Sequence, residues 1–134
     1  MRPAALVIIA AAVIGVISLQ GNADAAASGD IFRIQSSIIS YYHTHNALPH
    51  DIKSLQVKGL KRGISSYTYT YADDPFGQNQ WADVCAQFGH DTMNGAYSGS
   101  VSNSPDAYAF HRKGRQCYEN SFIKGQAQIS IIPD

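Results

Sequence analysis

The chain has 134 residues, with ten Lys and Arg against ten Asp and Glu, so its formal net charge is zero. Proteins that bind nucleic acid through a broad electrostatic surface carry a basic excess, so nucleic acid is not an expected partner. Charged residues make up 15% of the chain and hydrophobic residues 45%, a composition that excludes disordered and coiled-coil proteins.

An uninterrupted apolar run, Ala4 to Leu19, follows Arg2. As a helix, this run would span about 24 Å. That is less than the roughly 30 Å of a bilayer core, but the run is longer than a typical signal-peptide core. Ala23 to Ala25 fit a signal-peptidase site with cleavage before Ala26. Residues 1–25 are therefore either a transmembrane anchor or a removed signal segment. A buried helix of a soluble protein is the less favoured alternative, because a helix that is apolar on every face is hard to bury in so small a domain.

Both alternatives place residues 26–134, here called the head, outside the cytoplasm, because Arg2 holds the N-terminus inside. The head is then either anchored by a single pass through the cell membrane or released as a secreted or periplasmic protein. The two cysteines, Cys85 and Cys117, agree with export, since no CxxC or Cys/His cluster has zinc spacing. One disulfide is the simplest interpretation, and two buried free thiols are the alternative.

The first predicted element of the head is an amphipathic helix over about 30–46. Residues 20–29 are small and polar, and predict either a linker or a continuation of the first helix. Asp30 stands at an N-cap position, and Pro49 disfavours helix at the residue before it. Apolar side chains then recur at three- to four-residue steps, with Tyr41 or Tyr42 at the fourth. The predicted seam against a sheet is Ile31, Ile34, Ile38 and Tyr41.

Strands are predicted from about residue 66 onward, after a short helical turn at 51–55. Tyr67 to Tyr71 alternates with period two and is the clearest strand. Ala72 to Gly77 is a turn, and Gln80 to Phe88 a second strand antiparallel to the first.

The remainder is predicted to combine a long loop with short strands. Gly89 to Pro105 is rich in Gly, Ser and Asn and indicates an exposed loop. Asp106 to His111 is a short third strand, and 112–115 is a turn into a return strand at 116–118. Gln126 to Ile132 is a further edge strand.

Several of these motifs together are typical of one family. Tyr41 to Pro49 is followed by Leu55, and Asp74, Pro75 and Gly77 form a turn followed by Trp81. In this order and spacing, residues 4–118 resemble the type IV pilin and type II secretion pseudopilin family, and in particular a small Cys-containing subgroup.

The resemblance implies an α+β fold, in which an N-terminal hydrophobic helix continues into an amphipathic helix packed on a small antiparallel sheet. It also implies a non-enzymatic subunit, anchored in the membrane by its N-terminal helix. Such a subunit associates with further copies or with other pilin-like subunits in a type IV pilus or type II secretion-like filament. A disulfide would then tie the strand at Cys85 to the strand at Cys117.

The candidate metal ligands of the chain are its five histidines and the carboxylates of its loops. His43 and His45 are two apart on a helix and point in different directions. His90, Asp91 and His111 flank the long loop and are the one histidine arrangement worth testing. The resemblance makes Asp91 and Asp106 candidate ligands of a calcium ion, although no twelve-residue loop with a closing Glu is present. No other cofactor or metal is expected.

No catalytic motif is present: there is no Gly-x-Ser-x-Gly, no His-Glu-x-x-His and no phosphate-binding glycine loop. An enzyme is therefore not expected. Two basic clusters, 58–62 and 112–115, accompany Tyr67, Tyr69, Tyr71 and Trp81, which would offer stacking platforms to a nucleic acid. The alternative function is a secreted binding module whose ligand surface is the 89–105 loop and the tyrosine strand.

Overall fold

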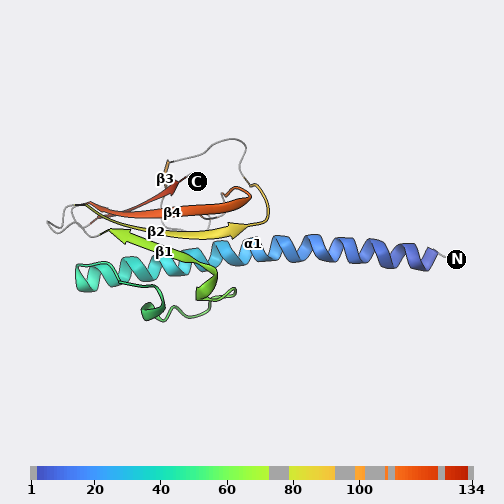
Figure 1. The fold of residues 1–134 in the computed structure, drawn as a ribbon, viewed down its shortest axis with the longest axis horizontal. Coiled ribbons are helices and arrows are strands. Elements are labelled where there is room, and N and C mark those ends of the chain that lie inside the picture. Colours follow the sequence, from blue (N-terminus) through green and yellow to red (C-terminus); the bar gives the residue numbers. More distant parts are fainter. Residues whose placement is uncertain are drawn as a thin grey trace.

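The computed structural model describes residues 3–72, 79–92, 99–101, 108, 111–123 and 126–132, with side chains for residues 23–72, 80–92, 108, 111–122 and 130. These residues form one long helix, α1, packed on an antiparallel sheet (Figure 1). The predicted α+β class, a helix on a small antiparallel sheet, is confirmed. The side chains of the apolar run 4–19 lie outside the described residues.

The helix α1 runs without a break from Pro3 to His45. The segment 20–29 therefore continues the first helix and is not a linker. Asp30 is consequently inside the helix, and its predicted role as an N-cap is wrong. After His45, Asn46 adopts a left-handed conformation, with φ 54°, and its N–H donates to the Tyr42 carbonyl at 2.7 Å. A left-handed residue at this position is a common helix stop.

The sheet contains five strands among the described residues, in the order β1-β2-β4-β5-β3, and every neighbouring pair is antiparallel. Their bounds are Thr68–Ala72 (β1), Asn79–Phe88 (β2), Gly99–Val101 (β3), Gly114–Ile123 (β4) and Gln126–Ile132 (β5). The C-terminal part of α1 lies along this sheet, while its N-terminal part extends well beyond it (Figure 1). Two short 3-10 helices, Lys53–Leu55 and Ile64–Ser66, connect α1 to β1.

The C-terminal half of the sheet differs from the prediction. Tyr108 is helical and His111 lies outside any strand, so no strand includes these two residues of the expected 106–111 segment. The expected loop contains the short strand β3. This strand pairs with β5, so β5 lies between β4 and β3 and is not an edge. These strands are positioned by pairing between distant segments, which the local sequence pattern does not reveal.

The alternation of β2 and β4 gives the sheet two different faces. The face toward α1 is apolar and carries the buried side chains Ala82, Val84, Ala86, Phe88, Tyr118 and Phe122. The opposite face, here called the outer face, carries Cys85, Cys117 and a set of charged and polar side chains. Thus α1 covers one face, and the outer face holds the disulfide.

Candidate functional site

The seam between α1 and the sheet is built on a single helix face. Ile31, Ile34 and Ile38 are each 0% exposed. The next step along this face reaches Tyr42, which is buried and stacks on Phe122 of β4, with ring centroids 4.1 Å apart. Tyr41, the predicted fourth member, is only partly buried and stacks on His45 at 3.9 Å. Residues four apart share a helix face, so Tyr42 follows Ile38 in the seam.

A buried amide fixes how α1 sits on the sheet. Gln35 is 0% exposed, and its Nε2 donates to the Tyr118 carbonyl of β4 at 3.1 Å. Its Oε1 accepts a hydrogen bond from Nδ2 of Asn120, on the same strand. A shift of the helix along the sheet would leave these buried groups without partners. The seam therefore has polar contacts that specify one position as well as apolar contacts that stabilise it.

Asp30 docks the connection between α1 and β1. Its carboxylate accepts hydrogen bonds from the Lys61 N–H at 2.8 Å, the Arg62 N–H at 2.9 Å and the Tyr67 hydroxyl at 2.6 Å. Burial, followed by this bond to the carboxylate, raises the pKa of Tyr67 well above its usual value. The carboxylate thus holds the 61–67 segment against the middle of α1.

A second carboxylate docks the end of β2 at the point where α1 leaves the sheet. Asp24 Oδ1 accepts from the Gly89 N–H at 2.8 Å, and Oδ2 accepts from the His90 N–H at 3.0 Å. His90 Nδ1 is 3.1 Å from the same Oδ2. Burial of Asp24 opposes ionisation, but the hydrogen bonds from Gly89 and His90 outweigh it and hold the pKa below its usual value. A residue before the head is therefore part of its packing.

His111 lies beside this contact. It is 2% exposed, stacks on Phe88 with ring centroids 3.8 Å apart, and its Nδ1 has no hydrogen-bond partner. Burial lowers the pKa of His111, while Asp24 and Asp91 oppose the shift less strongly and His90 both opposes and adds to it. At neutral pH the native state therefore holds an uncharged His111.

We expect His111 to make the head less stable in mild acid. Because its folded pKa lies below the unfolded 6.5, the unfolded state binds more protons below that pH. The contribution of His111 to the free energy of unfolding is then complete above about pH 6.5. This contribution is lost as the pH drops through the folded pKa. Replacing His111 by Phe keeps an aromatic ring against Phe88 and removes this titration. Urea unfolding at pH 7 and pH 5 should show a smaller loss for His111→Phe than for the wild type; equal losses would exclude His111 as the cause.

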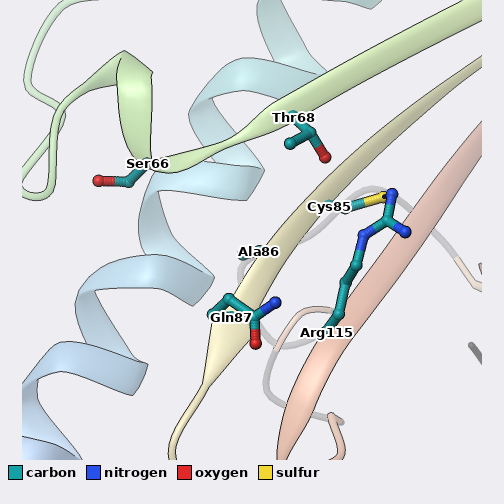
Figure 2. Close-up of a pocket in the computed structure, with 6 residues that line it drawn as sticks. All are labelled: Ser66, Thr68, Cys85, Ala86, Gln87 and Arg115. Atoms are coloured by element: carbon teal, nitrogen blue, oxygen red, sulfur yellow. Dashed lines mark hydrogen bonds between the residues drawn. The ribbon is translucent and has the colours of Figure 1, made fainter.

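The disulfide predicted between Cys85 and Cys117 is present on the outer face. The two residues lie directly opposite one another on β2 and β4, with Cα atoms 4.0 Å apart. Arg115, two residues before Cys117 on the same face, places its Nη2 3.5 Å from the Cys85 sulfur. Figure 2 shows the Arg115 side chain reaching from β4 toward Cys85. The staple therefore has a cation in contact with one of its two sulfurs.

Two carboxylates face one another on the other side of the disulfide. Asp83 of β2 lies opposite Glu119 of β4 in the strand register. Burial, followed by the charge of Glu119 and a hydrogen bond shared with it, raises the pKa of Asp83 to about 6. Arg115 acts in the opposite direction. The sequence showed no such carboxylate pair, because only the strand register brings the two residues together.

Removing one carboxylate of this pair should stabilise the protein at neutral pH. The native state binds a proton at Asp83 more tightly than the unfolded state, so stability falls as the pH rises from about 4 to 6. Asp83→Asn should raise the free energy of unfolding by about 0.2–1 kcal/mol at pH 7, the usual cost of like charges opposite one another. The gain should vanish near pH 4. Asp51→Asn, at an exposed site, is the matched control; an equal effect there would contradict this cause.

The predicted stacking residues are not gathered on one surface. Tyr67 is buried, the hydroxyl of Tyr69 donates to the Pro49 carbonyl at 2.7 Å, and Tyr71 bonds to His50 at 2.8 Å. These side chains belong to the α1 side of the sheet, whereas Trp81, 36% exposed, is on the outer face. Arg62, from one predicted basic cluster, donates to the Gln87 carbonyl and lies over the Tyr67 ring. The three tyrosines and Trp81 therefore lie on opposite faces of the sheet and do not form one aromatic surface.

Of the two calcium candidates, the structure describes Asp91 alone. Asp91 is exposed, and its Oδ1 accepts from the Lys113 N–H at 2.6 Å. Asp106 lies outside the described residues, as do Asp74, Pro75 and Gly77 of the turn motif. Within the described part of the chain, no group of three or more His, Cys, Asp or Glu side chains is arranged to hold a metal ion.

The membrane prediction falls largely on side chains that are not described. Within the part of the chain that the structure describes, no helical segment combines the length and apolarity needed to cross a membrane. The apolar run 4–19 lies in the part of α1 for which only the backbone is described.

Sequence reasoning missed the polar docking residues Asp24, Asp30, Gln35 and Asn120. The sequence offers one signal for such a residue, a polar side chain at a seam position, as for Gln35 between Ile34 and Ile38. Comparisons of the chain with protein-family models, with curated proteins and with solved structures find no match.

Proposed function

We propose that this chain is a non-enzymatic, pilin-like or pseudopilin-like subunit. Its N-terminal helix anchors it in the cytoplasmic membrane, its head lies outside the cytoplasm, and it associates with further copies or other pilin-like subunits. One observation carries this proposal: the single helix α1, Pro3–His45, serves two purposes. Its C-terminal part forms the seam with the sheet, and its N-terminal part extends past the sheet with the apolar run 4–19 (Figure 1).

The physical reason lies in what the extended part can contact. An apolar helix beyond its own sheet needs lipid or other protein chains to cover it. Ala, Val, Ile and Leu suit both environments, and a single Gly15 leaves the run helical. The disulfide agrees with a location outside the cytoplasm, where such bonds persist.

The alternative is a secreted or periplasmic binding module released by cleavage before Ala26. The contacts of Asp24 favour retention of the anchor, because cleavage there would remove the carboxylate that holds Gly89 and His90. Cleavage before Ala26 would also cut α1, the helix that packs on the sheet. A released head would start with these N–H groups unpaired.

The test is the intact mass of the mature protein in membrane and soluble fractions, with and without reductant. A species that retains residues 4–19 in the membrane fraction supports the anchored subunit. A soluble species that begins at Ala26 overturns it and leaves the binding module. Self-association of the anchored species in detergent, measured by crosslinking, tests assembly separately.

A paired substitution sharpens this experiment. Replacing both Ile8 and Val13 by Arg places two charges in the apolar run, each costing about 2.5–3.5 kcal/mol near a bilayer centre. The variant should leave the membrane fraction. Gln56→Arg, at an exposed position of the head, is the matched control and should remain. Retention of the doubly charged variant would count against anchoring by this run.

A further inference from the structure

One pocket of the described structure opens beside the disulfide. It has a volume of about 50 Å³ and is lined by Ser66, Thr68, Cys85, Ala86, Gln87 and Arg115 (Figure 2). A space of this size accommodates a thiol group with its first methylene. Cys85 and Cys117 are only 4% and 8% exposed, and the pocket offers an approach to the Cys85 sulfur.

Most of the pocket lining comes from the β1 and β2 side of Cys85, away from Cys117, and Arg115 reaches the pocket from β4. Thr68 of β1, Cys85 of β2 and Cys117 of β4 occupy one row across the sheet. Thr68 lines the pocket, and Cys117 lies on the opposite side of Cys85. Thiol–disulfide exchange is a displacement at sulfur in which the attacking and leaving sulfurs stand on opposite sides of the attacked one. A thiolate on the Thr68 side of the pocket would therefore face the Cys85 sulfur with Cys117 opposite, as attack at Cys85 requires.

The two sides of the disulfide carry opposite charges. Arg115, which lines the pocket, donates to the Cys85 sulfur at 3.5 Å. Asp83 and Glu119 form the next row of the outer face, on the other side of the disulfide. An anionic nucleophile is attracted by the guanidinium and repelled by the carboxylates. Both charges thus direct it to the pocket side.

We propose that this pocket admits a thiolate that attacks the Cys85 sulfur, so that Cys85–Cys117 is an exchangeable disulfide and not only a structural staple. The co-reactant is a dithiol, either of low molecular weight or on a protein. Its first thiolate forms a bond to Cys85, the Cys85–Cys117 bond breaks, and the electron pair leaves with Cys117, which takes a proton from water. Its second thiolate then displaces Cys85, so the dithiol is oxidised as the protein disulfide is reduced.

The first measurement identifies the attacked sulfur. The full-length protein in detergent is treated with reduced glutathione, quenched with acid, and its free thiols are alkylated before peptide mass analysis. The mixed disulfide should form on Cys85, with Cys117 alkylated. Mixed disulfides mainly on Cys117, or in equal amounts on both, would overturn the proposal.

The second measurement tests the charges. Arg115→Gln should lower the second-order rate constant with glutathione thiolate about threefold to tenfold, and Glu119→Gln should raise it. Arg115→Lys should retain most of the wild-type rate. Lys113→Gln removes the same charge from an exposed residue outside the pocket and is the matched control. The cationic thiol cysteamine should show the opposite dependence; no difference between the variants would overturn the proposed role of Arg115.

A third measurement separates exchange in the folded state from exchange after unfolding. The observed rate should rise linearly with thiolate concentration and should exceed the unfolding rate measured in urea. A rate that saturates at the unfolding rate would show that the bond is a buried staple. Dithiothreitol and a thioredoxin-type protein dithiol, compared at equal thiolate concentration, distinguish a small-molecule from a protein reductant.

Discussion

Asp30→Ala is expected to lower the free energy of unfolding by about 3–5 kcal/mol. The substitution removes the acceptor of three hydrogen bonds, from the Lys61 and Arg62 N–H groups and the Tyr67 hydroxyl. Each buried donor left without a partner costs about 1–3 kcal/mol, and the two N–H groups are only partly buried. Urea unfolding followed by circular dichroism measures the loss.

The control for this result is Asp51→Ala. Asp51 also accepts a backbone N–H, that of Ser54 at 2.7 Å, but at an exposed site where water replaces the lost acceptor. We expect a loss below about 1 kcal/mol there. Equal losses in the two variants would show that Asp30 contributes no more than an ordinary turn residue, and would contradict its docking role.

Phe122→Ala is expected to cost about 3–5 kcal/mol, the usual loss for truncating a buried aromatic side chain. Phe122 is 0% exposed and stacks on Tyr42 near the C-terminal end of α1. The truncation leaves a cavity between α1 and β4, so the seam should loosen there first. Hydrogen exchange of the last turns of α1 should rise together with the loss in stability.

The adjacent Ser121 supplies a matched control on the same strand. It is partly exposed on the outer face, and its hydroxyl donates to Glu119 at 2.9 Å. Ser121→Ala should change the stability by less than about 1 kcal/mol and leave exchange in α1 unchanged. Faster exchange in α1 after this substitution would mean that the effect of Phe122 comes from the strand and not from the seam.

Local patterns predicted the elements that have strong periodicity. The three- and four-residue steps of Ile31, Ile34 and Ile38 are those of a helix face, and all three side chains are buried. The alternation after Tyr67 and the run to Phe88 are both strands, antiparallel as predicted. One-residue differences, such as Tyr42 in place of Tyr41, arise because a four-residue step and a three-residue step fit a short pattern equally well.

The rest depended on contacts between distant parts of the chain. The strand β3 is three residues long and is held by pairing with β5, so a Gly- and Ser-rich segment forms a strand without a local signal. Asp30 is a residue type that favours helix N-caps, but in the structure its carboxylate docks the 61–67 segment. Only the path of that segment decides between the two roles. The pair of Asp83 and Glu119 likewise exists only because β2 and β4 are in register.

The continuity of α1 has a mechanical consequence. A pull along the axis of the extended N-terminal part is transmitted to the sheet without a hinge, because Pro3–His45 is one helix. Such a load is parallel to the seam and shears its contacts together, from Ala27 through Ile34 to Tyr42. Breaking it requires many contacts to fail at once, whereas a load that lifts the helix away from the sheet breaks them one after another. The head therefore resists tension along its own helix more strongly than tension across it.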